Sequence, residues 1–129
     1  MIDGYGAPSH RLNDVSLLYR VLMDLPKKIG MRRIGFPHIV EITESPITGL
    51  SGFTFIMESH ISVHTYSERG FFTADIYSCK TFDPKEVTRR LEQAFELKTI
   101  ETKLVVRGSK FHLSPAPSSR SSSKRRRDA

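Results

Sequence analysis

The sequence has no tryptophan, a single cysteine and no long hydrophobic run. One cysteine cannot form an internal disulfide, and it cannot supply a zinc site built from four cysteines. Low cysteine usage is typical of a reducing compartment, so we expect a cytoplasmic protein. No apolar run approaches the ~18 residues that a membrane-spanning helix needs. The first ten residues, MIDGYGAPSH, also lack the charged and then apolar pattern of a secretory signal.

The net charge of +6 is concentrated at the carboxyl end of the chain. Residues 118–129, SSRSSSKRRRDA, carry a net charge of +4, which leaves +2 for the first 117 residues. Proline and serine replace periodic apolar residues from about residue 114, so we expect one domain over residues 1–113 and a disordered basic tail over residues 114–129. A KRRR cluster is more often a solvated tail than a binding site, so we do not expect nucleic acid to be the main partner.

The first segment with helical periodicity covers residues 13–30. Its apolar residues recur three and four positions apart. Asn13 or Asp14 can cap the start of this helix. We expect Pro26 to kink or end the regular helix and Gly30 to close the segment.

A second helix is predicted from residue 84 onward. Asp83 is the expected N-cap, Pro84 the first helical residue and Glu86 the third, a variant of the capping box. Val87, Leu91, Ala94 and Phe95 form the predicted apolar stripe.

The remaining segments are typical of β-strands. Pro37 indicates that the strand over residues 31–42 lies at a sheet edge or contains a bulge. The order of elements, β-α-β-β-β-β-α-β, predicts an α+β fold: a two-layer sandwich with a mainly antiparallel sheet and two helices on one face. After a first strand at the amino end, the expected strands cover residues 31–42, 52–58, 60–66, 71–79 and 99–108.

The strand over residues 60–66 alternates polar and apolar side chains. One face carries His60, Ser62 and His64, and the other carries Ile61, Val63 and Thr65. A polar face on a central strand is unusual for simple packing. We therefore expect this face to line a site or a wet interface, with His60 and Ser62 lining rather than reacting.

The stretch from Ser51 to Cys79 resembles the processing and active-site region of the small, prokaryotic, pyruvoyl-dependent S-adenosylmethionine decarboxylases. The resemblance rests on Glu58-Ser59-His60, with Ser51 before it, His64 five residues after Ser59 and Cys79 twenty residues after Ser59. It extends more weakly over about residues 1–110, and it implies the same α+β fold.

This resemblance implies a proenzyme that cleaves itself between Glu58 and Ser59. The Ser59 hydroxyl would attack the Glu58 carbonyl to form an ester. Loss of the Ser59 Cα proton would then expel the Glu58 carboxylate and lead to a pyruvoyl group on the new amino terminus. By the same resemblance, His64 accepts that proton, and Ser51 donates a hydrogen bond to the scissile carbonyl or to the developing oxyanion.

The pyruvoyl group made from Ser59 is the one cofactor that the resemblance implies, and no metal is expected. Its ketone would form a Schiff base with the substrate amine and accept electrons as CO₂ leaves. Cys79 would then return a proton to the substrate. The implied substrate is S-adenosylmethionine, whose decarboxylated product supplies aminopropyl groups for polyamines such as spermidine. Members of the family pair, so we expect at least a homodimer.

Two departures from the family pattern keep alternatives open. Lys80 follows Cys79 where glycine is common, and a cation there could act on the thiol or meet a substrate carboxylate. Residues 44–49 lack the aromatic that stacks on adenine in adenosyl-binding members. Ornithine or arginine therefore remains an alternative substrate, with Glu44, Glu58 or Glu68 as a partner for its cationic side chain. A further alternative is a non-catalytic module that binds nucleic acid through the basic tail.

Overall fold

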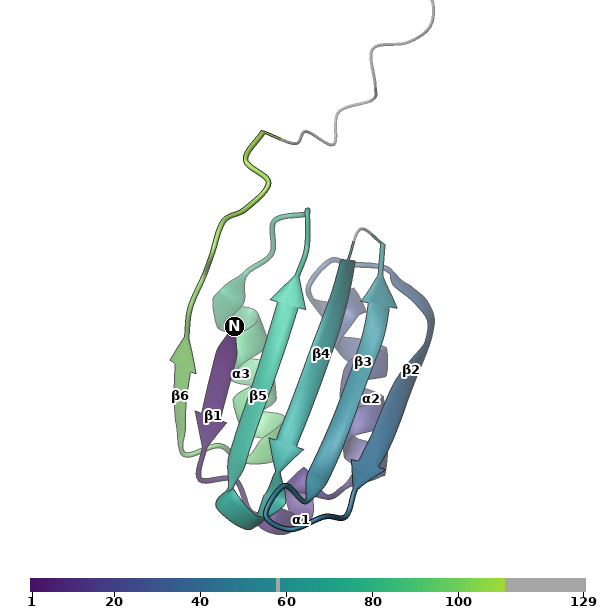
Figure 1. Cartoon of the computed structure of the whole chain (residues 1–129). Helices are drawn as coiled ribbons and strands as arrows, with labels where there is room; N and C mark the ends of the chain where they lie inside the picture. Colours follow the sequence, from purple (N-terminus) through teal and green to yellow (C-terminus); the bar gives the residue numbers. More distant parts are fainter. Residues whose placement is uncertain (58, 111–129) are drawn as a thin grey trace, which may run out of the picture.

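The computed structural model describes residues 1–57 and 59–110, so Glu58 and the expected tail over residues 114–129 lie outside the described residues. The strands form one antiparallel sheet of six in the order β2-β3-β4-β5-β1-β6, and α2 and α3 lie behind it (Figure 1). The expected α+β two-layer fold is confirmed. The elements are β1 (Ile2–Tyr5), α1 (Ser9–Leu12), α2 (Val15–Lys28), β2 (Arg33–Ile42), β3 (Gly49–Ile56), β4 (Ser59–Tyr66), the 3₁₀ helix η1 (Ser67–Arg69), β5 (Phe71–Tyr77), α3 (Pro84–Phe95) and β6 (Thr99–Thr102).

Helix α2 begins where the sequence predicts but ends differently. The Asp14 side chain caps it by accepting from the Leu17 N–H at 3.0 Å. The expectation that Pro26 would kink or end the regular helix is wrong about the end, because α2 continues to Lys28. Pro26 has no N–H to donate to the preceding turn and crowds the carbonyl there, but the chain after it still donates into the helix, since the Ile29 N–H donates to the Leu25 carbonyl at 3.1 Å. Gly30, with φ of 79°, then closes the segment as expected.

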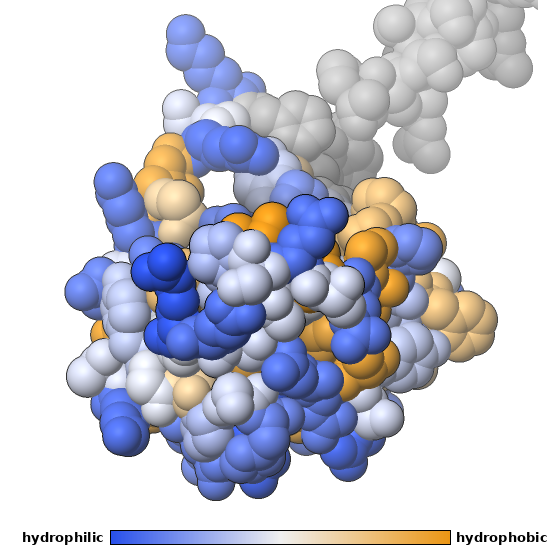
Figure 2. Space-filling view, turned by 60° about the horizontal axis from the view of Figure 1, so that its bottom comes forward, coloured by the Kyte–Doolittle hydropathy of each residue, from blue (hydrophilic) through white to orange (hydrophobic). Residues whose placement is uncertain are grey.

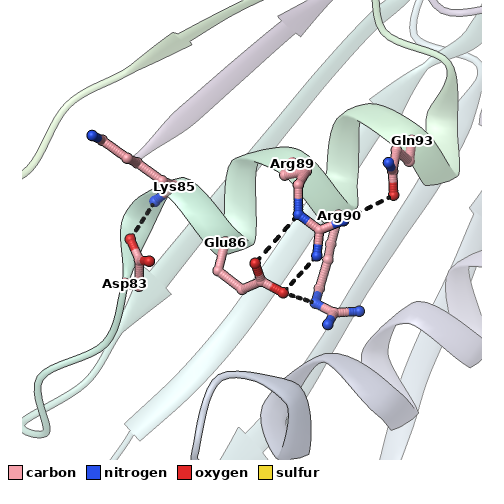
Figure 3. A network of polar contacts seen from close by, with 6 residues as sticks. All are labelled: Asp83, Lys85, Glu86, Arg89, Arg90 and Gln93. Atoms are coloured by element: carbon pink, nitrogen blue, oxygen red, sulfur yellow. Dashed lines mark hydrogen bonds and ion pairs between the residues drawn. The ribbon is translucent and has the colours of Figure 1, made fainter.

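Helix α3 keeps the predicted cap but not the complete capping box. Asp83 accepts from the backbone N–H two residues on at 2.9 Å, and Pro84 is the first helical residue. The Glu86 carboxylate turns forward instead, accepting from Arg89 at 2.8 Å and from Arg90 at 2.6 Å (Figure 3). Two arginines one turn along outcompete a single backbone N–H, since charge-assisted hydrogen bonds are the stronger kind.

Of the two outer strands, β2 agrees with its prediction, whereas β6 ends earlier than predicted. β2 lies at the sheet edge and its register shifts between Ile34 and His38, so the expectation for Pro37 is confirmed on both counts. The last strand ends at Thr102 rather than at residue 108. Its pairing with β1 runs out at Met1, whose amino group donates to the carbonyl of residue 103, and the side chains that follow are exposed.

The sheet has one face packed against helices and one open face. Ile61 and Val63 are buried on the helix side, where the core lies, whereas the neighbouring His64 is exposed on the other side. No helix of the described residues covers that other face (Figure 1). Its apolar part lies over β2 and β3, the right-hand side of Figure 2, where the largest orange area is seen. This part carries Ile34, Val40, Phe53 and Phe55, which are 38% to 57% exposed.

The helices were also compared with the length and hydropathy that a membrane span needs. Among residues 1–57 and 59–110, no helix is long and apolar enough to cross a bilayer.

Candidate active site

Ser51 and His64 form a hydrogen-bonded pair on the open face. They are register partners on β3 and β4, and the Ser51 Oγ lies 2.8 Å from His64 Nδ1. The residues next to them fix this register from the buried side: the Thr65 hydroxyl accepts from the Leu50 N–H at 2.8 Å and donates to the Leu12 carbonyl at 2.7 Å. The pair is therefore held by a buried hydrogen-bond chain, and its geometry suits a base with an adjacent hydroxyl.

Gly49 allows the strands to approach closely beside this pair. A Cβ at Gly49 would collide with the backbone carbonyl of Thr65, so any larger residue would push β3 away from β4. The glycine thus helps to keep Ser51 opposite His64.

Ser59 occupies the first position of β4, opposite Ile56. Its Oγ is buried and has no hydrogen-bond partner among the described residues. An unsatisfied buried hydroxyl costs roughly 1–3 kcal/mol, so such a group calls for a functional explanation. Within the same residues Thr54 Oγ1 is the other side-chain atom of this kind, and nothing in its surroundings suggests a role.

Cys79 lies at the same end of the sheet as Ser59. It follows β5 by two residues, and Tyr77, the last residue of β5, pairs with His60 directly after Ser59. The Cys79 side chain is exposed. The topology therefore places the predicted proton donor beside the predicted cleavage site.

A pocket of about 910 Å³ opens at this end of the molecule. It is lined by residues of β4 and β5, by the connection between β5 and α3, by the first turns of α3 and by residues 102–108. Cys79 lines this pocket, and so do His60 and Ser62, as expected from the alternation of β4.

The predicted site residues form two groups that are far apart within one chain. Ser59 and Cys79 lie at one end of β4, and Ser51 and His64 lie towards the other. His64 lies five positions after Ser59 along the strand, about 16 Å at ~3.3 Å per residue, and an odd spacing puts their side chains on opposite faces. A proton transfer needs heavy atoms within about 3 Å, so His64 cannot serve the Ser59 of its own chain in this arrangement.

Sequence reasoning did not assign several pocket residues. Asp75 and Tyr77 share the open face with Ser62 and His60, their register partners, and line the pocket. Their period-two alternation could have identified them. The Arg107 guanidinium lies 3.6 Å from the centre of the Tyr77 ring. The sequence did not predict this contact, because residues 99–108 were expected to form a strand, whereas the strand ends at Thr102.

The comparisons with known proteins show the family of the chain and agree with its fold. The family model described as S-adenosylmethionine decarboxylase matches residues 1–108. The S-adenosylmethionine decarboxylase proenzyme of Clostridium botulinum is 39% identical over 109 residues, covering 84% of this chain and 90% of the relative. The proenzyme of the same name from Geobacillus kaustophilus is 28% identical over 106 residues, 81% of each chain. The crystal structure of the adenosylmethionine decarboxylase from Aquifex aeolicus VF5 superimposes with a TM-score of 0.62 at 25% identity, covering 84% of this chain and 91% of that one.

Proposed function

Because the chain belongs to the S-adenosylmethionine decarboxylase family, we propose that it is a self-cleaving, pyruvoyl-dependent decarboxylase of S-adenosylmethionine that serves polyamine biosynthesis. The catalytic domain spans residues 1–113, and cleavage between Glu58 and Ser59 yields two chains. The enzyme is a homodimer or a larger assembly.

The observation that carries this proposal is the state of the Ser59 hydroxyl. It is buried without a partner among the described residues, at the first position of β4 and directly after residue 58. None of the described residues donates a hydrogen bond to this oxygen, so none of them competes for its lone pairs. Conversion of Ser59 to a pyruvoyl group removes the O–H, and with it the unfavourable burial of an unsatisfied donor. The residue therefore fits as the precursor of this group.

The bound pyruvoyl group would supply a ketone that takes up the substrate amine and the electrons released with CO₂. The chain's own residues then handle the protons. His64, oriented by Ser51 at 2.8 Å, accepts the Cα proton of Ser59 during cleavage. Cys79, in the pocket, delivers a proton to the substrate carbon after CO₂ has left.

The separation of the two groups within one chain supports a site shared between two copies. If the open faces of two copies pack together about a two-fold axis that crosses the strands, the Ser51–His64 end of one copy lies over the Ser59–Cys79 end of the other. Such packing would also cover the exposed apolar residues of β2 and β3, among them Phe53 and Phe55. His64 then acts on the Cα–H of the partner's Ser59, a backbone bond at the start of β4, while the Ser59 side chain itself lies on the helix side.

The pocket is lined by groups of both charges: Lys80, Lys103 and Arg107 are cationic, and Asp75 is acidic. Asp75 offers a carboxylate to a cationic part of the substrate, and the nearby Tyr77 ring already holds the Arg107 guanidinium on one face. S-adenosylmethionine, with its sulfonium group, fits this chemistry. Among the acidic residues considered for a basic amino acid, Glu68 instead accepts from the Ser45 hydroxyl at 2.9 Å.

Two measurements test the proposal. Intact mass spectrometry of the purified protein should give chains of 58 and 71 residues, the second without a free α-amine, and Ser59→Ala should remain a single 129-residue chain. A CO₂-release assay across S-adenosylmethionine, ornithine, arginine and lysine should show turnover with the first substrate. A wild-type protein that stays uncleaved after prolonged incubation contradicts the proposal, and turnover of a basic amino acid alone would change the substrate.

A further inference from the structure

We propose that Lys80 is a positioning residue that holds Cys79 in place relative to the Ser59 end of β4. The inference rests on the proposed function. Lys80 lies in the connection between β5 and α3, residues 78–83, which we call the Cys79 loop. Its backbone N–H donates to the Ser78 hydroxyl at 2.9 Å, and its ammonium donates to the Gly30 carbonyl at 2.9 Å. The residue after the predicted proton donor thus makes exposed hydrogen bonds through both its backbone and its side chain.

The anchor for the ammonium is the turn between α2 and β2, residues 29–32. Gly30 has a left-handed backbone with φ of 79°, and it directly follows the end of α2. The carboxyl end of a helix carries partial negative charge, which favours a cation such as Lys80. The nearby helix carbonyls of Pro26 and Lys27 already accept backbone hydrogen bonds from within this segment, whereas the Gly30 carbonyl points to the Cys79 loop.

The same turn also contacts the segment just before Ser59. The Arg32 carbonyl accepts from the Met57 N–H at 2.8 Å, two residues before Ser59. The α2–β2 turn, the end of β3 and the Cys79 loop all lie at one end of the sheet (Figure 1). The α2–β2 turn therefore contacts both the segment that leads to Ser59 and the Cys79 loop. Lys80 makes the contact between this turn and the Cys79 loop.

The position of the Cys79 thiol decides which of two carbon atoms receives its proton. After CO₂ leaves, the Cys79 proton must reach the α-carbon of the substrate. If the thiol is displaced, the proton can instead go to the former Cα of Ser59. One water molecule then releases the substrate skeleton as an aldehyde, and the substrate nitrogen stays on the protein as an alanyl amino terminus. A displacement of about 1 Å can cost up to ~100-fold in rate, so a loop tether is enough to affect this choice.

The test compares Lys80→Met, which keeps a long side chain but has no donor, with Lys80→Arg, which keeps a cationic donor. Lys85→Met is the matched control, because it removes an exposed lysine from the start of α3 nearby. For Lys80→Met we expect kcat to fall about three- to tenfold with KM within about twofold, and the fraction of alanyl termini per turnover to rise. Lys80→Arg should restore most of both quantities, and Lys85→Met should match wild type.

A readout that needs no turnover completes the test. In the uncleaved Ser59→Ala background, Lys80→Met should speed amide hydrogen exchange in residues 78–82, and Lys85→Met should not. If wild type is active and Lys80→Met equals it in kcat, alanyl fraction and exchange, the inference about Lys80 is wrong while the proposed function stands. If wild type neither cleaves nor releases CO₂, the proposed function fails and the inference fails with it.

Discussion

The imidazole of His64 and the thiol of Cys79 are assigned to different steps, His64 to cleavage and Cys79 to turnover of the substrate. Cys79 lies in an exposed loop after β5, and His64 lies within β4 beside Ser51. Cleavage and turnover should therefore be separable by single substitutions.

We expect Cys79→Ala to cleave itself but to lose about 100-fold or more in kcat, the usual contribution of a positioned general acid. Cys79→Ser should cleave and recover little activity, since a hydroxyl is a much weaker acid than a thiol. The measurements are intact mass for cleavage and CO₂ release for turnover. Wild-type turnover in Cys79→Ala would show that the proton comes from another group.

The candidate residues could be predicted from the sequence, but their distribution in space could not. The spacing between Ser59 and His64 is a linear pattern, and a resemblance transfers it without geometry. Only the strand register puts Ser51 opposite His64 and leaves Ser59 on the other face. The role of Lys80 also depends on a contact with Gly30, fifty residues away in the chain, which no local pattern can indicate.

At the level of helices and strands, the errors of the sequence analysis lie where tertiary contacts compete with local preference. α2 passes Pro26 because the residue lies in the last turn, and β6 ends at Thr102 because its partner strand ends. The edge position of β2 was predictable, because proline itself cannot donate to a sheet ladder. Elements whose ends depend on their own residues were thus predicted better than those whose ends depend on a neighbour.

Helix α3 carries a charge network with a predictable pH dependence. Hydrogen bonding from Arg89, and then from Arg90, lowers the pKa of Glu86 against the opposing effect of desolvation. A carboxylate with a lowered pKa stabilises the fold above its unfolded-state pKa, and this stabilisation is lost as the pH falls through the lowered value. The network is exposed to solvent, so the effect should be small and should decrease with salt.

We therefore expect Glu86→Gln to lower Tm slightly at pH 7, and the difference from wild type to disappear as the pH falls into the range where Glu86 is protonated. Glu92→Gln is the matched control, because Glu92 is exposed on the same helix and has no ion pair among the described residues. Thermal melts from pH 7 down to acid pH measure both. A Tm difference that stays constant with pH would show that the charge of Glu86 does not contribute.

For the molecule as a whole, the open face and the divided site have one common explanation. A single copy leaves apolar residues of β2 and β3 exposed, and it keeps His64 about 16 Å from its own Ser59. Pairing of two open faces addresses both facts at once, because it covers the apolar residues and brings the His64 of one copy to the end of β4 that carries the Ser59 backbone, and so its Cα–H, in the other. A dimer of this kind would carry two identical sites, each made from both chains.

Such a shared site predicts complementation between two inactive variants. Ser59→Ala cannot cleave because it has no hydroxyl to attack, yet it still carries His64; His64→Ala keeps Ser59 but should stall as an ester that hydroxylamine can cut. When the two are co-expressed with different affinity tags and mixed dimers are isolated, the chain with His64→Ala should cleave and the chain with Ser59→Ala should not. The control replaces the Ser59→Ala partner with a double variant that lacks both side chains, which should leave every chain uncleaved. If the mixed dimers also stay intact, His64 does not act across the interface; if His64→Ala cleaves by itself at the wild-type rate, another group takes the Ser59 proton.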